Sequence, residues 1–533
     1  MNEPILRMVA SVVTACLLCA STTKLLGGLQ QSGYAGKNFL RWLKRKDNLY
    51  FNRLAVLSLC LAVQTAVVSL CFSFLGVKTA LILSAVPFWG GMLFFLFADS
   101  KYALKVPVNY TGRLKRLYGA YIATTLCFSY IFIAYLAFLA EVNGSFIYGL
   151  IAYVPFAVMP TLCPLTLLFA NWLMGGFERK RNEKYVKRAG QVLNEQEIIR
   201  IGVVGSYGKT SVKNILKTLL SEKYAVVATP ESFNTPMGIA KTVCAADFYQ
   251  KQIFIAEMGA RKAGDIQELC ALVKPDYAVF TGICEQHIQT FGSLENIWKE
   301  KSEILRCGAK KVVCGESLRA YVERDFKDNA DAVVFESGVC ELDSGAAATA
   351  FTLRLFGQDV AVTTKLLGNA AVENIRLAVR LCLELDMTAD EILRGIEKLE
   401  PIPHRLQLTE SNGIYILDDG YNCNPKGAEE ALLALSRFAG KKVVVTPGIV
   451  ECGVLEEKIN GELGEKLAQK NFDKVILVGN TLVGAVKKGY LDGNGNTEAL
   501  AVVPTLAAAQ KLLGGYLEEG DAVLFLNDLP DVY

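Results

Sequence analysis

The sequence predicts an α-helical transmembrane domain followed by α/β domains that contain a phosphate-binding loop. Three observations lead to this fold class. Apolar runs long enough to cross a bilayer occur only in the first third of the chain. From residue 199 onward, short apolar strands alternate with amphipathic helices. At the first of these strands, the stretch IGVVGSYGKTSVKN places glycines, a lysine and a threonine between a strand and a helix.

The composition limits the class of protein. The chain has 533 residues, which predicts roughly two to four domains. Hydrophobic residues make up 52% of the chain, a high fraction for a soluble protein. The net charge is only +3, so no overall basic field argues for nucleic acid as a partner. The 15 cysteines are scattered, which favours free thiols in a reducing compartment.

Five apolar runs match the roughly 20 residues that a membrane-spanning helix needs. The fifth run contains Pro155, Pro160 and Pro164, which predict a kinked or broken helix. We therefore expect a transmembrane domain over residues 1–176, followed by a basic juxtamembrane linker over residues 177–198. The five runs are residues 5–26, 54–75, 79–97, 118–139 and 147–174.

Basic residues predict the orientation of these spans. They concentrate after the first, third and fifth spans, and the other two loops are nearly uncharged. By the positive-inside rule, the N-terminus lies outside a bacterial plasma membrane and the chain after Arg179 is cytoplasmic. The clusters either only set this topology or also contact an anionic lipid or lipid-phosphate substrate. They comprise Lys37, Arg41, Lys44, Arg45, Lys46 and Arg53; Lys101, Lys105, Arg113, Lys115 and Arg116; and Arg179, Lys180, Arg181, Lys184, Lys187 and Arg188.

The glycine turn after the first strand predicts a site for nucleotide phosphates. Its backbone N–H groups and the start of the following helix would face an anion. Lys209 would neutralise the β- and γ-phosphates, and the Thr210 hydroxyl would ligate Mg²⁺. The spacing is shorter than that of a Walker A loop, whose first glycine would fall at Val203. The residues of this predicted site are Gly205, Ser206, Gly208, Lys209, Thr210 and Ser211.

Two later strand ends carry candidate metal ligands. Glu257 closes the strand IFIAE, where a carboxylate beside a phosphate loop is well placed for Mg²⁺. His287 follows the next strand and is one of only two histidines in the chain. It is a candidate ligand for a second metal, although a structural role is the alternative. A helix carrying Lys299 and Lys301 follows.

The order of the motifs resembles that of the Mur ligases over residues 199 to 533. These motifs are GSYGKT, FNTPMG, EMGA, QHIQTFGS, KSEI, PIPHRLQL, LDDGYNCNP and TPGIVECG. The branch of the family that they resemble most joins D-alanyl-D-alanine to a muramyl tripeptide. The resemblance implies a central P-loop ATPase domain over residues 199–398. A smaller, Rossmann-like α/β domain would follow over residues 399–533.

The resemblance also implies roles for single residues. ATP and two Mg²⁺ ions would bind, with Thr210 and Glu257 at one ion and His287 at the other. Lys301 matches a lysine that is carbamylated in several Mur ligases and helps to hold that second metal. The catalytic residues would be Lys209, His287, Lys301 and Arg405. Asn374 would lie near adenine, and Arg405 and Asp419 would close on the phosphates and ribose. Asn234 and Asn422 would bind substrate, with Asn234 facing the acceptor or acyl phosphate and Asn422 beside Tyr421 in the loop presenting Asp419.

Four departures from the family pattern concern the substrate. The soluble domain that holds a UDP-sugar is replaced by the five apolar runs. Ala370 and Ala371 stand where the family has His-Asn, and Gly282 stands where it has the asparagine of T-N-I. The C-terminal LFLNDLPDVY lacks the usual K-G-S. Recognition of the nucleotide base, the acceptor and the incoming dipeptide is therefore open.

The first functional hypothesis is a membrane-anchored, ATP-dependent ligase that releases ADP and phosphate in peptidoglycan synthesis. Its partners would be an amino acid or short peptide, a carboxylate acceptor that could be lipid-linked, the membrane, and other proteins of wall synthesis. One alternative is a synthase of poly-γ-glutamate or another capsule polymer. The other is a scaffold of wall synthesis that binds ATP without turnover.

Overall fold

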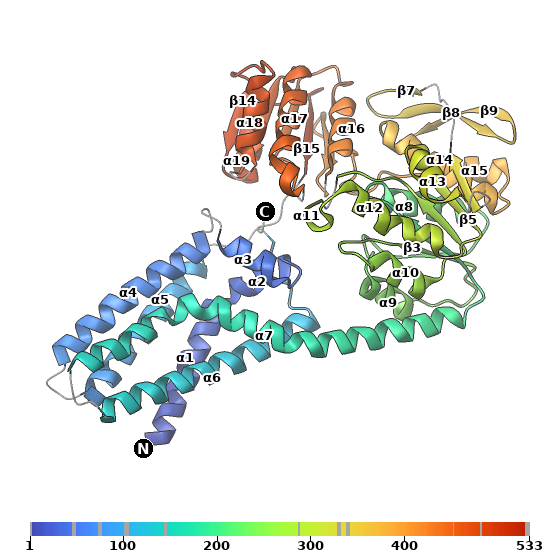
Figure 1. The fold of residues 1–533 in the computed structure, drawn as a ribbon. Helices are drawn as coiled ribbons and strands as arrows, with labels where there is room; N and C mark the ends of the chain where they lie inside the picture. The colour runs from blue at the N-terminus through green and yellow to red at the C-terminus, as the bar shows by residue number, and fades with distance from the viewer. Residues whose placement is uncertain are drawn as a thin grey trace. The chain divides into compact units, whose positions relative to one another are not determined.

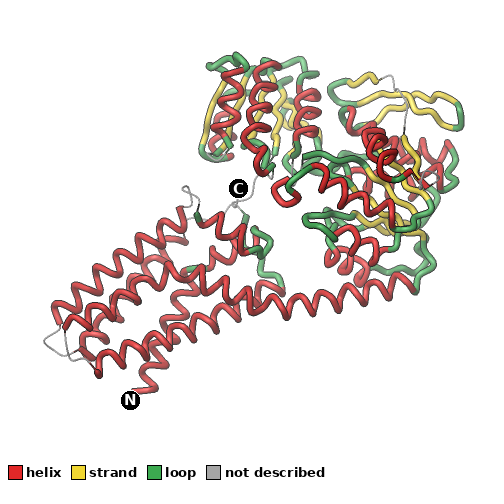
Figure 2. The backbone as a smooth tube through the Cα atoms, viewed as in Figure 1, coloured by secondary structure: helices red, strands yellow, loops and turns green. Residues whose placement is uncertain are grey.

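The computed structural model describes residues 3–44, 49–72, 77–100, 106–142, 146–285, 288–327, 332–336, 342–421, 423–450, 452–479 and 482–527. The chain divides into two compact units. The first comprises Met1–Arg181 with Leu529–Tyr533, and the second comprises Asn182–Asp528. The first is helical and the second contains both helices and strands (Figures 1 and 2).

The first unit is a helical bundle whose long helices coincide with the five apolar runs. Its core includes Leu18 of α1, Phe88 and Met92 of α5, Tyr121 of α6 and Leu167 of α7. Other large apolar side chains point outward; Phe94 and Trp172 are 74% and 72% exposed. The helices are α1 (Glu3–Ser21), α2 (Thr23–Gln31), α3 (Gly36–Leu43), α4 (Leu49–Phe72), α5 (Val77–Ser100), α6 (Gly112–Val142) and α7 (Phe146–Asn194).

Among the described residues, three helical stretches are long and apolar enough to cross a membrane: Pro4–Ser21, Gly112–Tyr135 and Val158–Asn194. Asn52–Gln64 and Val86–Ser100 are shorter apolar stretches, and they lie in the runs 54–75 and 79–97, which are only partly described. Three of the five predicted runs therefore contain a candidate span, and the other two stay predictions.

Two further predictions for this unit need correction. The first apolar run was expected to continue to Leu26, but α1 ends at Ser21 and the chain turns into the separate helix α2. The fifth run was expected to be kinked or broken; α7 continues from Phe146 to Asn194 through all three prolines, so the helix is not broken there. A proline removes one N–H donor, and a helix can accommodate this loss without ending. Most of the predicted linker 177–198 is consequently helical.

The second unit begins with a six-stranded parallel sheet in the order β2-β3-β1-β4-β5-β6. Apolar side chains cover both of its faces, and the strands on either side of the central one are almost entirely buried. The strands are β1 (Ile199–Val204), β2 (Val226–Ala228), β3 (Ile253–Glu257), β4 (Tyr277–Phe280), β5 (Lys311–Gly315) and β6 (Val333–Glu336). The helices are α8 (Lys209–Leu220), α9 (Pro236–Ala245), α10 (Asp265–Val273), α11 (Ile288–Phe291), α12 (Leu294–Lys301), α13 (Arg319–Asp325), α14 (Asn369–Glu384) and α15 (Ala389–Glu397).

A small antiparallel sheet and a second large sheet follow. The small sheet contains β7 (Leu342–Ser344), β8 (Thr349–Leu355) and β9 (Gln358–Thr364). The large sheet has the order β10-β11-β15-β12-β13-β14, and only the edge strand β10 is antiparallel to its neighbour. Its elements are β10 (Gln407–Ser411), β11 (Ile414–Asp419), α16 (Pro425–Leu435), β12 (Lys442–Thr446), α17 (Glu456–Gln469), β13 (Lys474–Val478), α18 (Val483–Asp492), β14 (Leu500–Val503), α19 (Leu506–Leu513) and β15 (Ala522–Leu526). The α/β prediction for this part of the chain is confirmed.

Candidate functional site

The predicted phosphate loop joins the central strand β1 to α8. The neighbours β3 and β4 flank β1, and the chain crosses from one side of β1 to the other between them. Ligands of parallel α/β sheets bind at the carboxyl ends of strands at such a point. Gly208 directly precedes α8 with φ +71°, and a Cβ there would lie 2.5 Å from Asn374 Oδ1. Both the backbone conformation and this close approach require glycine.

Two lysines converge on the carbonyl oxygen of Gly205. Lys209 Nζ donates to it at 2.8 Å, and Lys301 Nζ donates to it at 3.1 Å. Lys301 is only 1% exposed. Burial and, secondarily, the nearby Lys209 lower the pKa of Lys301 to about 7. Part of the Lys301 population is therefore a neutral amine near pH 7, the form that reacts with CO₂ in carbamylation.

Glu257 lies opposite these lysines at the end of β3 and is almost fully buried. Its Oε1 accepts a hydrogen bond from Asn234 Nδ2 at 3.0 Å. Its Oε2 forms an ion pair at 3.3 Å with Lys213, which is also 1% exposed. Lys213 Nζ additionally donates to the carbonyl of Glu231. Lys213 thus joins α8, β3 and the loop that carries Asn234.

A cavity of about 340 Å³ opens between these groups. Ser206 Oγ, in its lining, is buried without a hydrogen bond, and Glu257 Oε2 has no hydrogen bond beside its ion pair with Lys213. Buried polar atoms with unused hydrogen-bonding capacity next to lysines fit a phosphate chain and its cation. Its lining includes Gly208, Lys209, Thr210, Ser211, Asn234, Glu257, Arg261, Lys262, Lys301 and Arg405.

Metal binding here would use few protein ligands. The part of the chain that the structure describes contains no group of three or more histidine, cysteine, aspartate and glutamate side chains suited to a metal. Thr210 and Glu257 line the same cavity, so together they could hold one Mg²⁺. Mg²⁺ usually keeps several waters and takes substrate phosphate oxygens beside one or two carboxylates. The residues therefore fit one such ion bound together with a nucleotide.

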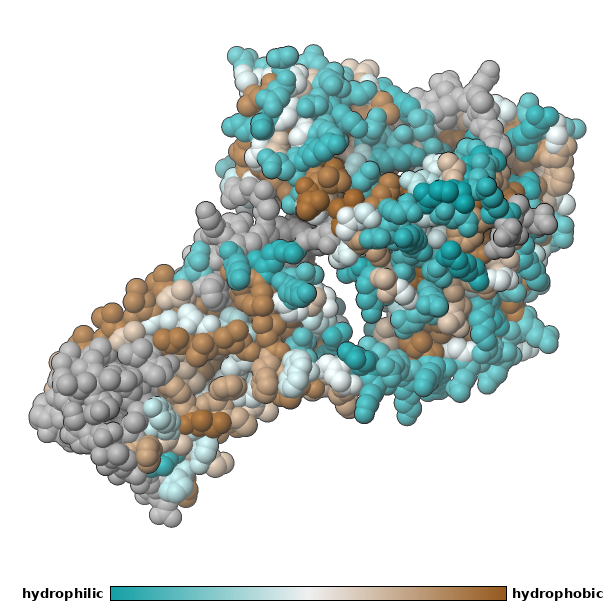
Figure 3. Space-filling view, viewed as in Figure 1, coloured by the Kyte–Doolittle hydropathy of each residue, from teal (hydrophilic) through white to brown (hydrophobic). Residues whose placement is uncertain are grey.

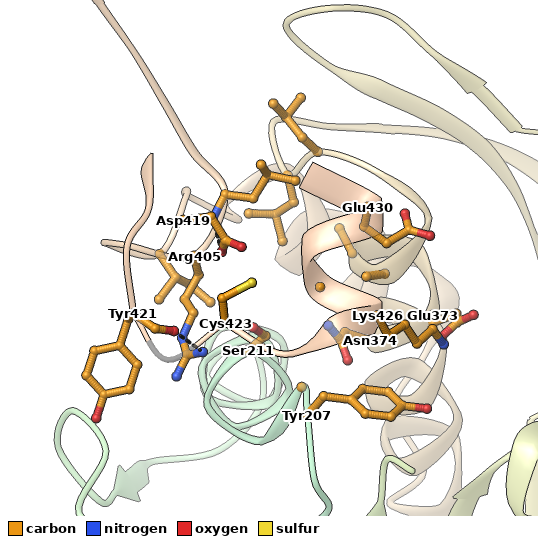
Figure 4. Close-up of a pocket in the computed structure, with 18 of the residues that line it drawn as sticks. Tyr207, Ser211, Glu373, Asn374, Arg405, Asp419, Tyr421, Cys423, Lys426 and Glu430 are labelled. Carbon is orange, nitrogen blue, oxygen red and sulfur yellow. Dashed lines mark hydrogen bonds and ion pairs between the residues drawn. The ribbon is translucent and has the colours of Figure 1, made fainter. Parts of the chain in front are cut away.

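A second cavity of about 130 Å³ shares Gly208 with the first in its lining (Figure 4). Arg405, at the start of the C-terminal domain, lines both cavities. Its Nη1 donates to the Tyr421 carbonyl at 3.1 Å, and its guanidinium lies 4.5 Å from the centre of the Tyr421 ring. Burial raises the pKa of the neighbouring Asp419 to about 6, although Arg405 opposes this shift.

The loop that presents Arg405 is strained. The residues on either side of it, His404 and Leu406, have φ of +60° and +49°. His404 Nδ1 lies 2.7 Å from Asp418 Oδ2, which ties the loop to β11, and Leu406 N donates to Asp419 Oδ1 at 3.1 Å. Such strain persists only where surrounding contacts hold the backbone.

The departure from the family pattern at Gly282 has a steric explanation. A Cβ on Gly282 would lie 2.1 Å from the Tyr207 hydroxyl oxygen. Tyr207 thus occupies the space that an asparagine at position 282 would need. Lys426 Nζ lies 4.8 Å from the centre of the Tyr207 ring and donates to Glu373 Oε2 at 2.9 Å. The contact between Lys426 and Tyr207 connects the C-terminal domain to the phosphate loop.

The structure gathers most of the predicted site residues around the two cavities. Asn374 and Asp419 line the smaller one, together with Ala370 and Ala371. Predicted ligands His287 and Asn422 lie outside the described residues. The prediction missed Lys213, Tyr207 and Lys426. Only Lys213 had a signal in the sequence, because it follows Lys209 by one helical turn and shares its face of the predicted helix.

Comparisons with known proteins agree with this arrangement. Residues 203–382 match the Mur ligase middle domain, and residues 404–527 match the Mur ligase glutamate ligase domain. The UDP-N-acetylmuramoyl-tripeptide--D-alanyl-D-alanine ligase of Bacillus subtilis is 29% identical over 288 residues, 52% of this chain and 62% of that enzyme. The Escherichia coli enzyme of the same name is 28% identical, over 52% of this chain and 64% of its own length. The match thus spans less than two thirds of either relative.

Solved structures show the same fold. The crystal structure of MurF ligase from Thermotoga maritima in complex with ADP has a TM-score of 0.58 and 26% identity. The match covers 65% of this chain and 80% of that one. MurF from Acinetobacter baumannii has the same TM-score with 23% identity, which shows the fold alone.

Proposed function

Because the chain belongs to the Mur ligase family, we propose that it is a membrane-anchored, MurF-like ligase that joins a carboxylate to an amine with ATP. One observation carries the proposal. Lys209 and Lys301 converge on one carbonyl of the phosphate loop, and Glu257 lies across the same cavity. This arrangement suits a reaction in which negative charge accumulates on a phosphoryl group and must be neutralised. The relatives found do not favour a capsule-polymer synthase.

The proposed reaction has two steps, and the site residues have a role in each. In the first, a substrate carboxylate oxygen attacks the γ-phosphorus of ATP and ADP leaves, which forms an acyl phosphate. Lys209, at the N-terminus of α8, and Arg405 are placed to hold the phosphates as charge moves. In the second, the amine attacks the acyl carbon, phosphate leaves and the amine loses a proton. Mg²⁺ bound at Thr210 and Glu257 would supply further positive charge.

The position of Arg405 explains why residues of two domains contribute to the site. It belongs to the C-terminal domain but lines both cavities, and Lys426 contacts Tyr207 beside the phosphate loop. Groups supplied by two domains allow the site to close around the nucleotide. Closure would exclude water, which protects an acyl phosphate from hydrolysis.

The membrane location is part of the proposal. Three helical stretches have the length and apolar character of spans, and the basic clusters favour a cytoplasmic site with the N-terminus outside. The matched residues correspond to the family's middle and C-terminal domains, and apolar helices precede them, which favours the proposal of a lipid-linked acceptor. Alkaline carbonate extraction tests the location, and release of the chain into the soluble fraction would contradict it.

The activity is tested with the full chain purified in detergent. We expect ADP formation that requires Mg²⁺, an amine such as D-alanyl-D-alanine, and a muramyl-peptide acceptor. UDP-linked and lipid-linked acceptors are supplied in parallel, and mass spectrometry identifies the product. ATP binding without ADP formation under every condition would contradict the ligase and favour a scaffold. Turnover with glutamate alone would favour the polymer synthase.

A further inference from the structure

The segment after the first candidate span is a packed helical hairpin. It comprises α2, a turn and α3, residues 23–43, and is called here the α2–α3 hairpin. The sequence predicted a basic loop whose charges either only set topology or also contact an anionic lipid or lipid-phosphate substrate. Such a loop needs no fixed structure. In the hairpin, however, Leu25, Leu26, Leu29, Phe39 and Trp42 are all buried.

Close packing holds the two helices of the hairpin together. Gly28 of α2 lies against the Trp42 ring of α3, and a Cβ at Gly28 would lie 2.3 Å from that ring. Only glycine allows the ring this close. Phe39 and Trp42 also contact each other, with ring centroids 5.6 Å apart. The apolar face of α3 is therefore buried against the protein, and the opposite face is exposed.

Polar contacts fasten the hairpin to the rest of the first unit. Gln30 Nε2 donates to the Asn109 carbonyl at 2.7 Å, and Asn109 N donates to Gln30 Oε1 at 3.1 Å. The Tyr34 carbonyl, in the turn, accepts from Asn171 Nδ2 of α7 at 3.1 Å. The Arg113 guanidinium lies 3.7 Å from the centre of the Tyr34 ring. These contacts hold the outer face of α3 in one place.

Some cationic side chains of the first unit form ion pairs with buried carboxylates, and others do not. Lys24 and Arg53 both form ion pairs with the buried Asp99, and the distance from Arg53 Nη1 to Asp99 Oδ1 is 2.9 Å. Arg116 forms an ion pair with the buried Glu178 at 2.7 Å.

Lys37, Arg41 and Lys44 are instead exposed. Their spacing of four and then three residues aligns them along one side of α3, and no carboxylate among the described residues forms an ion pair with them. They are called here the α3 stripe.

An aromatic side chain indicates the level of the α3 stripe in a membrane. Trp172 is 72% exposed and stacks on Phe169 with centroids 5.8 Å apart. It directly follows Asn171, whose amide holds the turn of the hairpin. Exposed tryptophans of membrane proteins concentrate at the headgroup level. Hydrophilic side chains also gather over the α2–α3 end of this unit, whereas brown apolar side chains cover much of the remainder (Figure 3).

We propose that the α3 stripe binds the phosphate groups of anionic lipids in the cytoplasmic leaflet. The proposal rests on the membrane location given under the proposed function. Three exposed cations that pair with no carboxylate in the described part of the chain, carried by a helix at headgroup level, are complementary to such phosphates. The hairpin fixes the stripe in position, so less freedom is lost when a headgroup binds. A site of this kind would hold anionic lipid beside the chain's first candidate span.

The test uses the full chain in nanodiscs of phosphatidylcholine with a trace of labelled phosphatidylglycerol. Lipid retained by the protein is measured by native mass spectrometry. The variant K37Q/R41Q/K44Q should retain at least about tenfold less phosphatidylglycerol than the wild type. K487Q/K488Q/K511Q removes three exposed lysines from the C-terminal domain and should leave retention unchanged.

Two further measurements separate the possible failures. Single variants, each losing one charge, should lower retention about three- to fivefold, so a triple variant that fails to insert does not end the test. Equal retention by wild type and all variants, with each inserted in the membrane, would overturn the inference. Failure of carbonate-resistant membrane association in the wild type would instead overturn the proposed location.

Discussion

The two units of this protein differ in how the charges of their lysine and arginine side chains are compensated. In the first unit, the buried carboxylates Asp99 and Glu178 neutralise the neighbouring lysine and arginine side chains. In the second unit, Lys209 and Lys301 share one backbone carbonyl, and neither forms an ion pair with a carboxylate among the described residues. An uncompensated buried charge is costly. The difference indicates that the first arrangement serves stability, whereas the second is prepared for a polyanionic ligand.

The largest expected effect is the loss of one of these uncompensated lysines. Replacing Lys209 by Ala should lower ADP formation by about 10³-fold, because the transferred phosphoryl group loses a preorganised cation. The thermal unfolding midpoint of the nucleotide-free chain should not fall. Lys217→Ala, an exposed lysine on the same helix, serves as the matched control. If the Lys209 variant formed ADP at nearly the wild-type rate, the unpaired lysines would not serve phosphate binding, and the contrast with the ion-paired cations of the first unit would be lost.

Lys213 is the exception within the second unit, because its partner is Glu257. Lys213→Met leaves a buried carboxylate without its counter-charge and should destabilise the nucleotide-free unit by about 3 kcal/mol. Mg²⁺ with ATP should restore more stability in this variant than in the wild type, since the metal then supplies the missing charge. Differential scanning calorimetry with and without Mg²⁺ and ATP measures both effects. An identical ligand-induced shift in variant and wild type would argue against a metal at Glu257.

The paired cations of the first unit should affect stability but not chemistry. Asp99→Asn leaves Lys24 and Arg53 facing each other and should lower the local opening free energy by about 2 kcal/mol, less than for Lys213 because Arg53 is partly exposed. Hydrogen exchange of α2 reports this loss, with Asp492→Asn as an exposed control. ADP formation with a soluble acceptor should remain unchanged. A large fall in that activity would contradict a purely structural role for Asp99.

The smallest effect is a pH dependence caused by Lys301. Its pKa is about 7 in the folded chain against 10.5 ordinarily, so the unfolded chain binds more protons between these values. Stability should therefore rise with pH through this window and be independent of Lys301 below it. The expected gain from pH 7 to pH 8.5 is roughly 1–2 kcal/mol. Lys301→Met should abolish this gain in urea titrations, and an unchanged slope would show that Lys301 is charged throughout.

Local pattern determined much of the second unit. The strand, glycine turn and helix around Gly205 to Lys209 could be predicted because each depends on neighbours in sequence. Glu257 could be placed because parallel strands end at one edge of a sheet. Arg405 and Asp419 could be named only through the motif order that resembles the Mur ligases, since nothing local shows that a distant loop returns to the phosphate loop.

The sequence by itself determined the helical first part, the α/β second part, the phosphate loop and the family. Tertiary structure alone decided which charges are neutralised and which are left for a ligand. Lys213 meets Glu257, Tyr207 fills the space above Gly282, and the basic segment after α1 packs as the α2–α3 hairpin. The physical reason is that pattern reports the face on which a side chain lies, whereas its partner depends on contacts between segments far apart in the chain.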